Sequence, residues 1–180
     1  GELLEELPLL RVENQGYIHY RKGSVVMYAL RDALGEEALN GALRRYVADV
    51  AYQEPPYTYA REFVDYIREV VPPGQEQLIT DLFEQITLYD ARATAAEVTP
   101  LEDGRYSVRV AVEAKKFRAD GQGVETEIPM NDWADIAIFG EREPGGPATG
   151  RVLAMERHHL TGEHTFEIVV DEEPLRAGVD

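Results

Sequence analysis

Residues 106–113 read YSVRVAVE, and this stretch decides the fold of the second half of the chain. Tyr106 and three valines alternate with polar or small residues, a period of two that is typical of a half-buried β-strand. A turn sequence, Asp-Gly-Gln-Gly at 120–123, then precedes a second alternating run. The expected strands cover residues 106–113, 124–130, 134–139, 152–160 and 164–170. About seven short strands predict an immunoglobulin-like β-sandwich over residues 89–180.

Before residue 88 the apolar side chains recur at helical spacing instead. Residues 38–50 place theirs on one continuous helix face, and a helix before them ends at Gly35. Thr58 is expected to cap a third helix, because it follows the helix-breaking pair Pro55-Pro56. The expected helices cover residues 24–34, 38–50, 58–70 and 78–86. The predicted fold class is α+β in two parts: an N-terminal all-α helical array over 1–88, followed by the C-terminal β-sandwich over 89–180.

Composition and charge exclude several classes of function. The 180 residues include 34 acidic and 18 basic side chains, and a net charge of -16 opposes binding to a phosphate backbone, so no nucleic-acid partner is expected. The absence of cysteine excludes disulfides, thiolate metal sites and a cysteine nucleophile. No apolar run approaches the roughly 20 residues that cross a bilayer. A soluble domain is expected, in a compartment that the sequence leaves unknown.

Both ends of the chain suggest a piece of a longer protein. The first methionine is Met27, and residues 175–180 carry no terminal signal. A cleaved tag explains the first observation equally well. We therefore expect the remainder of the same polypeptide to be a partner of this segment.

The sequence contains few groups of residues that resemble a catalytic or metal-binding site. His159 and His164 flank a turn, but two imidazoles without a third ligand make a poor metal site, and solvated histidines at strand ends explain them better. Adjacent carboxylates are better explained as a solvated face. Lys115-Lys116 is interpreted as a charged strand end that protects an edge. No metal site is expected in this chain.

The segment from Asn14 to Gly23, which reads NQGYIHYRKG, is the strongest candidate for a functional site. Tyr17 and Tyr20 lie just before a helix, and Gly23 lies in its first turn despite a cost of roughly 1 kcal/mol. Glycine there permits close approach of another backbone. A purely structural role, with both tyrosines as packing residues, is the alternative.

These residues resemble the aminopeptidase N-like zinc metallopeptidases, a gluzincin family. That family has a Tyr-Glu-Lys-Gly run, a helix, a Leu-Gly-acidic turn and a further helix, and this chain has Tyr-Arg-Lys-Gly at 20–23 and Leu-Gly-Glu-Glu at 34–37. The helix that starts at Thr58 takes the place of the family's Thr-x-x-Asp-Phe helix. The resemblance spans residues 12–88, and the β half resembles the domain that follows the catalytic domain in many members.

The resemblance implies a role for each of four residues. Tyr20 matches the tyrosine that donates a hydrogen bond to the oxyanion of the tetrahedral intermediate, Tyr17 and Lys22 are expected in the wall of the site, and Gly23 is expected to allow helix packing. A tyrosine phenol keeps its proton at neutral pH and is therefore a competent donor. Arg21 replaces the family's usual glutamate. We expect the Tyr20 hydroxyl to face an open surface.

The zinc-binding part of the family pattern is missing from this chain. The family's HExxH helix and downstream glutamate precede the tyrosine run, and neither is present. The chain alone is expected to be inactive, and zinc and the peptide substrate are expected only in a full-length parent, which the resemblance allows to be membrane-anchored. The alternative is a non-catalytic protein-interaction module or an inactive peptidase relic of a larger protein.

Overall fold

A computed structural model describes residues 5–142 and 144–179, and the chain divides into two compact units. Unit 1 contains Gly1–Thr87 and Arg118–Glu125. Unit 2 contains Leu88–Phe117 and Thr126–Asp180. The chain therefore enters each unit twice, and neither unit is a single continuous stretch of sequence.

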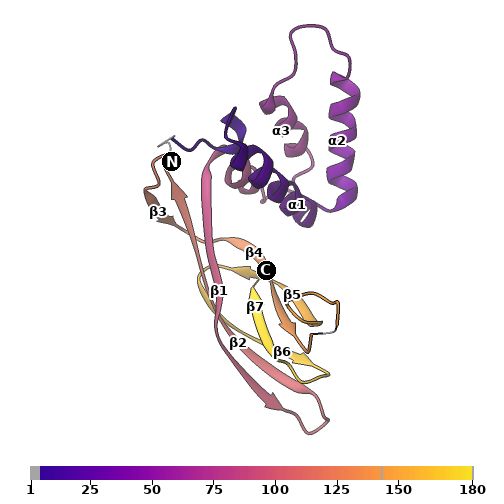
Figure 1. Ribbon diagram of the computed structural model, residues 1–180, viewed down its shortest axis with the longest axis vertical. Coiled ribbons are helices and arrows are strands. Elements are labelled where there is room, and N and C mark those ends of the chain that lie inside the picture. The colour runs from indigo at the N-terminus through magenta and orange to yellow at the C-terminus, as the bar shows by residue number, and fades with distance from the viewer. Residues whose placement is uncertain (1–4, 143, 180) are drawn as a thin grey trace. The chain divides into compact units, whose positions relative to one another are not determined.

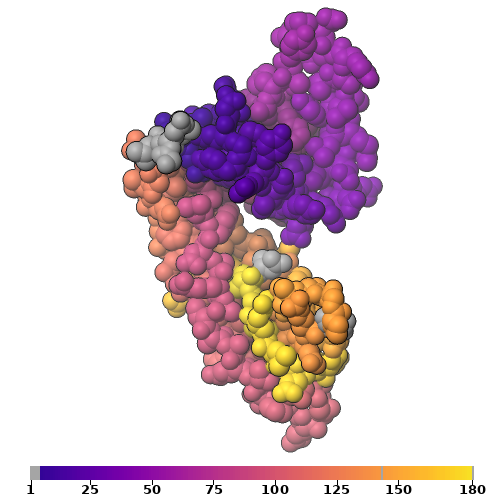
Figure 2. Space-filling model, in the orientation of Figure 1, coloured from indigo at the N-terminus to yellow at the C-terminus, as the bar shows by residue number. Residues whose placement is uncertain are grey.

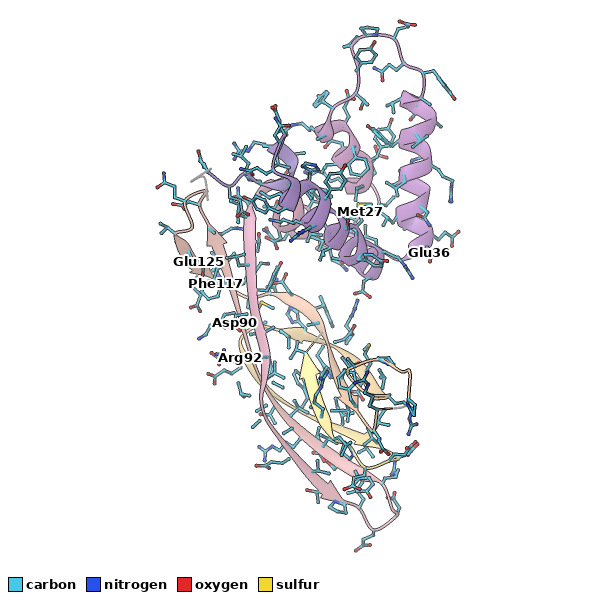
Figure 3. All side chains as sticks on the ribbon, viewed as in Figure 1. Met27, Glu36, Asp90, Arg92, Phe117 and Glu125 are labelled. Atoms are coloured by element: carbon cyan, nitrogen blue, oxygen red, sulfur yellow. The ribbon has the colours of Figure 1, made fainter. Side chains whose placement is uncertain are left out.

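The helical elements of the described residues all lie in unit 1 (Figure 1). They are η1 (Leu9–Arg11), η2 (Tyr17–Lys22), α1 (Gly23–Leu34), α2 (Glu36–Val50), α3 (Ala60–Arg68), α4 (Gln77–Ile79) and η3 (Thr80–Glu84). The element η1 is a 3-10 helix, and η2 and η3 are π-helices. Gly35 separates α1 from α2 with a φ of 83°, which glycine adopts readily, and Glu36 and Glu37 lie in the first turn of α2, as predicted. Figure 3 shows Glu36 at the start of α2.

The core of unit 1 consists of side chains that α1, α2, α3, α4 and η3 turn inward. Its buried members are Val26, Leu30, Leu39, Val64, Ile67, Ile79 and Phe83. Two sequence predictions about these helices are wrong. Tyr59 caps α3, and the Thr58 hydroxyl instead lies 3.2 Å from the Tyr46 hydroxyl. The expected helix over 78–86 is divided into α4 and η3, which ends at Glu84, and Ile86 begins a strand.

Seven strands form two antiparallel sheets. They are β1 (Ile86–Pro100), β2 (Tyr106–Ala119), β3 (Glu125–Ile128), β4 (Asp132–Phe139), β5 (Val152–Leu160), β6 (Glu163–Val170) and β7 (Arg176–Val179). In the first sheet β2 pairs with β1, β3 and β6, and in the second β4 lies between β5 and β7. Tyr106 lies opposite Val170 at one end of the β2–β6 pair, and Glu113 lies opposite Glu163 at the other.

The two sheets contribute to one apolar core in unit 2. The inward residues of β2, which are Val108, Val110 and Val112, are at most 2% exposed, and they belong to the same cluster as Ile136 on β4 and Ile168 on β6. The apolar residues of YSVRVAVE therefore recur at every second position because one face of this strand packs in the core. On β1, Asp90 and Arg92 are two residues apart and form an ion pair of 3.7 Å (Figure 3).

The predicted fold class is wrong. The structure is mixed α/β, with four α-helices and two antiparallel sheets among the described residues, and strands dominate from residue 86. The helices do not form an all-α array, because the unit that holds them also holds the end of β2, the following turn and the start of β3. The Glu6 amide donates to the Gly121 carbonyl at 2.8 Å, and the Arg118 guanidinium pairs with the buried carboxylate of Asp81. The predicted architecture, a purely helical domain followed by an immunoglobulin-like sandwich, is therefore not the one observed.

Gly121 is the point at which this turn is packed most tightly in unit 1. A Cβ atom at this position would lie 2.3 Å from Cγ of Glu5 and 2.7 Å from the Glu6 carbonyl oxygen. Neither separation is possible for real atoms without a backbone shift, so only glycine fits here. The turn is therefore built into unit 1 and is not a loop that merely passes over it.

Lys116 corrects the interpretation of the lysine pair as edge charges. Its side chain is buried, and its ammonium group donates to both carboxylate oxygens of Asp132 at 2.9 and 2.8 Å. The ammonium also lies 5.3 Å from the centre of the Tyr89 ring. Only Lys115 points outward, where it pairs with Glu113 at 2.7 Å. The side chains of the two lysines thus point to opposite faces of β2.

None of the helices within the described residues combines the length and the apolar character that a membrane crossing requires.

Candidate functional site

Three of the four predicted site residues lie in η2, which is a π-helix. Tyr17, Tyr20 and Lys22 are all part of this six-residue element, and Gly23 directly follows it. The Gly23 amide donates to the Ile18 carbonyl, five residues back, and the Ser24 hydroxyl donates to the Tyr20 carbonyl at 2.6 Å. Ile18 is 1% exposed and anchors the element in unit 1. Tyr20 is therefore carried on an anchored backbone that continues into α1.

The Tyr20 side chain is open to solvent, as the sequence predicted. It is 73% exposed, and its hydroxyl makes no hydrogen bond within residues 5–142 and 144–179. Its ring lies 4.6 Å from the His19 ring, with the two planes tilted by 45°. The hydroxyl is therefore free to donate to a group that approaches from outside.

Tyr17 and Lys22 lie near Tyr20 in the same element, but they do not enclose it. Tyr17 is 52% exposed, and Lys22 is only partly buried. Their role in a site wall stays a prediction. Figure 2 shows the segment that carries η2 and α1, in indigo, at the molecular surface.

Gly23 has more room around it than close helix packing would leave. An added Cβ atom would lie 3.8 Å from the Leu9 side chain and 3.9 Å from the Ile18 carbonyl oxygen, both ordinary contacts. Alanine would therefore fit at this position. Nothing in the packing of unit 1 requires glycine there.

The described residues do not fit a zinc ion. No group of three or more histidine, aspartate or glutamate side chains comes together within the part of the chain that the structure describes. His19, the histidine nearest Tyr20, is an exposed residue that stacks against the tyrosine ring. A zinc ion acting with Tyr20 would therefore need ligands from outside the described residues.

The histidines of unit 2 do not meet across their hairpin. His159 lies 2.6 Å from the Asn131 side-chain oxygen, whereas His164 accepts a hydrogen bond from the Thr161 amide at 3.0 Å. His158, which the sequence did not single out, stacks on the Phe166 ring at 4.1 Å. These contacts are structural ones.

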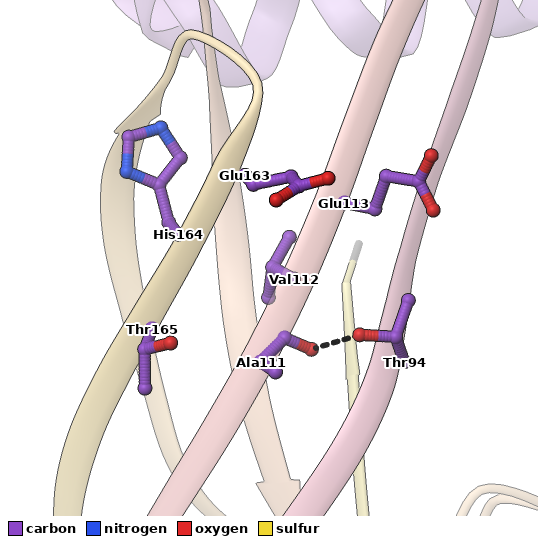
Figure 4. Close-up of a pocket in the computed structure, with 7 residues that line it drawn as sticks. All are labelled: Thr94, Ala111, Val112, Glu113, Glu163, His164 and Thr165. Atoms are coloured by element: carbon purple, nitrogen blue, oxygen red, sulfur yellow. Dashed lines mark hydrogen bonds between the residues drawn. The ribbon is translucent and has the colours of Figure 1, made fainter.

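A depression of unit 2 is open, and the described residues that line it form no catalytic group. Its volume is about 430 Å³, and it lies over β1, β2 and β6 (Figure 4). In Figure 4 the Thr94 hydroxyl donates to the Ala111 carbonyl across the strands, at 3.3 Å. The His164 ring lies apart from the carboxylates of Glu113 and Glu163.

Charge pairing also makes Glu113 unsuited to acid–base chemistry. Hydrogen bonds from Lys115 and Arg92, at 2.7 and 3.3 Å, lower the pKa of the Glu113 carboxyl below its ordinary value. Lys115 in turn has a raised pKa, because Glu113 accepts its hydrogen bond. Both groups are therefore held in their charged forms, and this depression is not the site.

One exposed aromatic side chain near Tyr20 was missed by the sequence analysis. Tyr28 follows Tyr17 and Tyr20 at i+11 and i+8, and it is 70% exposed. On a helix these three positions fall on one side, a signal that spacing alone contained. The exposed aromatic surface therefore extends beyond the YRKG run, along α1.

Comparison with protein-family models, curated proteins and solved structures finds no match to this chain. The resemblance to the zinc metallopeptidases thus rests on the Tyr-Arg-Lys-Gly run, the Leu-Gly-Glu-Glu turn and the helices that follow them.

Proposed function

We propose that this chain is part of a zinc-dependent aminopeptidase-like hydrolase that removes N-terminal residues from peptides, with Tyr20 as the donor to the oxyanion. Unit 1, which contains Gly1–Thr87 and Arg118–Glu125, belongs to its catalytic domain, and unit 2 forms the domain that follows. Tyr17 and Lys22 line the same site. The chain alone does not hydrolyse peptides, because the zinc ligands belong to the rest of the polypeptide.

The observation that carries this proposal is the exposure of the Tyr20 hydroxyl and its lack of a hydrogen bond within the described residues. The side chain nevertheless stands on an element anchored by a buried isoleucine. Packing does not account for a large aromatic side chain in this position. The element itself is a π-helix, a rare conformation that is found frequently at functional sites.

The geometry suits a donor to a developing negative charge. A phenol on a fixed backbone can be placed before the reaction, so that little reorganisation accompanies the formation of the oxyanion. Ile18 of η2 is buried, and Val26 of α1 belongs to the core of unit 1, so both hold that backbone in place. Tyr20 therefore stabilises the intermediate without a change of its own protonation state.

Replacement of the hydroxyl in the longer protein tests the proposal. Tyr20→Phe is expected to lower kcat by roughly 10²-fold for an aminoacyl p-nitroanilide, with KM little changed, because the lost hydrogen bond forms only in the transition state. Tyr57→Phe is the matched control, since Tyr57 is 71% exposed in the same unit and lies in a loop away from η2. An unaltered kcat in Tyr20→Phe would show that the hydroxyl has no catalytic role.

A second function, a non-catalytic interaction module or inactive relic of a larger membrane-anchored protein, is favoured by the exposed tyrosines. Tyr17, Tyr20 and Tyr28 would serve binding as well as catalysis. The upstream coding sequence separates the two functions. An HExxH motif followed by a glutamate supports the hydrolase, and a degenerate version supports the binding module.

A further inference from the structure

One side of η2 and α1 forms a surface that we call the tyrosine face. Its members are the exposed residues Tyr17, Tyr20, Arg21, Ser24 and Tyr28, and the half-buried Lys22 follows Arg21 in the chain. The three rings are 52%, 73% and 70% exposed. Ile18, Val26 and Leu30, on the other side, are at most 3% exposed. Core packing therefore explains one side of these helices and leaves the aromatic side unexplained.

The tyrosine face lies in the longest interval of the sequence without an acidic residue. None of the 34 aspartates and glutamates falls between Glu13 and Asp32, whereas Arg21, Lys22 and Arg31 do. In a chain with a net charge of -16, the interval itself therefore carries only positive formal charge.

Arg21 and Lys22 also lack an anionic partner among the residues that the structure describes. Neither forms an ion pair within the described residues, although acidic side chains outnumber basic ones almost two to one. Some other cations of unit 1 do find carboxylates: Arg45 pairs with Glu69 at 3.1 Å, and Arg68 with Glu84 at 2.8 Å. Two adjacent unpaired cations beside exposed rings are suited to an anionic ligand with apolar side chains.

The length of the tyrosine face indicates a ligand larger than a single ion. Tyr28 lies eleven positions after Tyr17, which corresponds to about 16 Å at the rise of an α-helix and to less here, because Tyr17–Lys22 is a π-helix. An extended chain of about five residues covers that distance. Tyrosine and arginine are also the residues that most often dominate protein interfaces.

From these observations we propose that the tyrosine face binds an acidic peptide segment, whose apolar side chains lie on Tyr17, Tyr20 and Tyr28 and whose carboxylates pair with Arg21 and Lys22. This binding is a property of the chain itself and requires no zinc and no hydrolysis. Its failure would therefore leave the proposed catalytic role of Tyr20 untouched, and failure of that role would leave the binding untouched.

Fluorescence anisotropy with the full 180-residue chain tests the proposal. The probes are a fluorescein-labelled peptide of alternating glutamate and leucine and its lysine–leucine counterpart. We expect the glutamate peptide to bind, the lysine peptide not to bind, and the affinity to fall as salt is raised, because the charges are exposed. The double variant R21E/K22E is expected to weaken binding at least tenfold, and Tyr28→Ala several-fold.

Arg44→Glu is the matched control, because Arg44 is an exposed arginine of α2 that forms no ion pair within the described residues. It changes the net charge by half as much as R21E/K22E and is expected to change the affinity less than twofold. R21Q/K22Q, with circular dichroism of every variant, separates a loss of binding from a loss of folding.

Equal binding of the two peptides, or an affinity unaffected by R21E/K22E and R21Q/K22Q, overturns the proposal. Sedimentation supplies a further test. A dimer of the chain that R21E/K22E dissociates would make a second copy the occupant of the tyrosine face, and would overturn the assignment to a peptide.

Discussion

Strand β2 and the segment η2–α1 are both rich in apolar residues, yet they use them differently. On β2 the valines point into the core of unit 2, and the outward positions carry residues such as Arg109 and Glu113. On η2–α1 the inward positions are filled as well, but the outward positions carry three exposed tyrosines. The fold alone accounts for the composition of β2. It does not account for the tyrosines, so these are the residues for which a function must be sought.

The largest effect is expected from a polar residue in the buried face of β2. Val110→Gln removes a fully buried valine and places an amide without partners in the core, at a cost of about 3–5 kcal/mol in the free energy of unfolding. Arg109→Gln, on the exposed face of the same strand, is expected to cost less than about 0.5 kcal/mol. Urea denaturation measures both. Equal costs would mean that β2 does not separate a core face from a solvent face.

The buried ion pair of β2 gives the next largest effect. Asp132→Ala removes the carboxylate that holds the buried Lys116 ammonium, and a loss of about 3 kcal/mol is expected. The double variant Lys116→Met with Asp132→Leu removes both charges and is expected to recover most of that loss. If the double variant is as unstable as Asp132→Ala, the loss does not come from leaving the Lys116 charge unpaired, and the expectation is wrong.

A smaller effect, and one that depends on pH, is expected from Asp135 on β4. Hydrogen bonds from Arg157, at 3.0 and 2.8 Å, lower the pKa of the Asp135 carboxyl. Because the folded pKa lies below the unfolded one, the stabilisation is present above a pH of about 4 and is lost as pH falls through the folded value. Asp135→Asn is expected to cost less than about 1 kcal/mol at pH 7 and nothing at strongly acidic pH. A cost that grows on acidification would contradict the direction of the shift.

The smallest effect is expected on the tyrosine face. Tyr28→Ala removes a ring that is 70% exposed, and the free energy of unfolding is expected to change by less than about 0.5 kcal/mol. Thermal and urea denaturation test this. A loss comparable to that of Val110→Gln would show that Tyr28 is a core residue, and the contrast between β2 and η2–α1 would disappear.

Local patterns predicted the elements whose own residues determine them. Apolar spacing located α2, and Gly35 located the boundary between α1 and α2, because a positive φ depends on a single residue. The alternation around Val110 located β2 for the same reason. Exposure of Tyr20 was also predictable, whereas its place in a π-helix was not, since no residue pattern specifies a bond to the fifth preceding carbonyl.

Elements that depend on a distant partner were missed. β1 contains the alanine-rich run of residues 91–96, which has little strand preference of its own, and it is stabilised by pairing with β2. Lys116 looked like a surface residue because its partner, Asp132, lies sixteen positions further along the chain. The sequence analysis also did not predict that unit 1 contains residues 118–125. The reason is the same, because Arg118 and its partner Asp81 are separated by β1 and most of β2.

The return of residues 118–125 to unit 1 sets an order for folding during synthesis. When residue 87 has left the ribosome, the amide of Glu6 and the carboxylate of Asp81 still lack the turn that contacts them. Synthesis must proceed through β1 and all of β2 before Gly121 can take its place against Glu5 and Glu6. The helices that carry Tyr20 therefore belong to a unit that is completed only after half of the strand-forming sequence has begun to emerge.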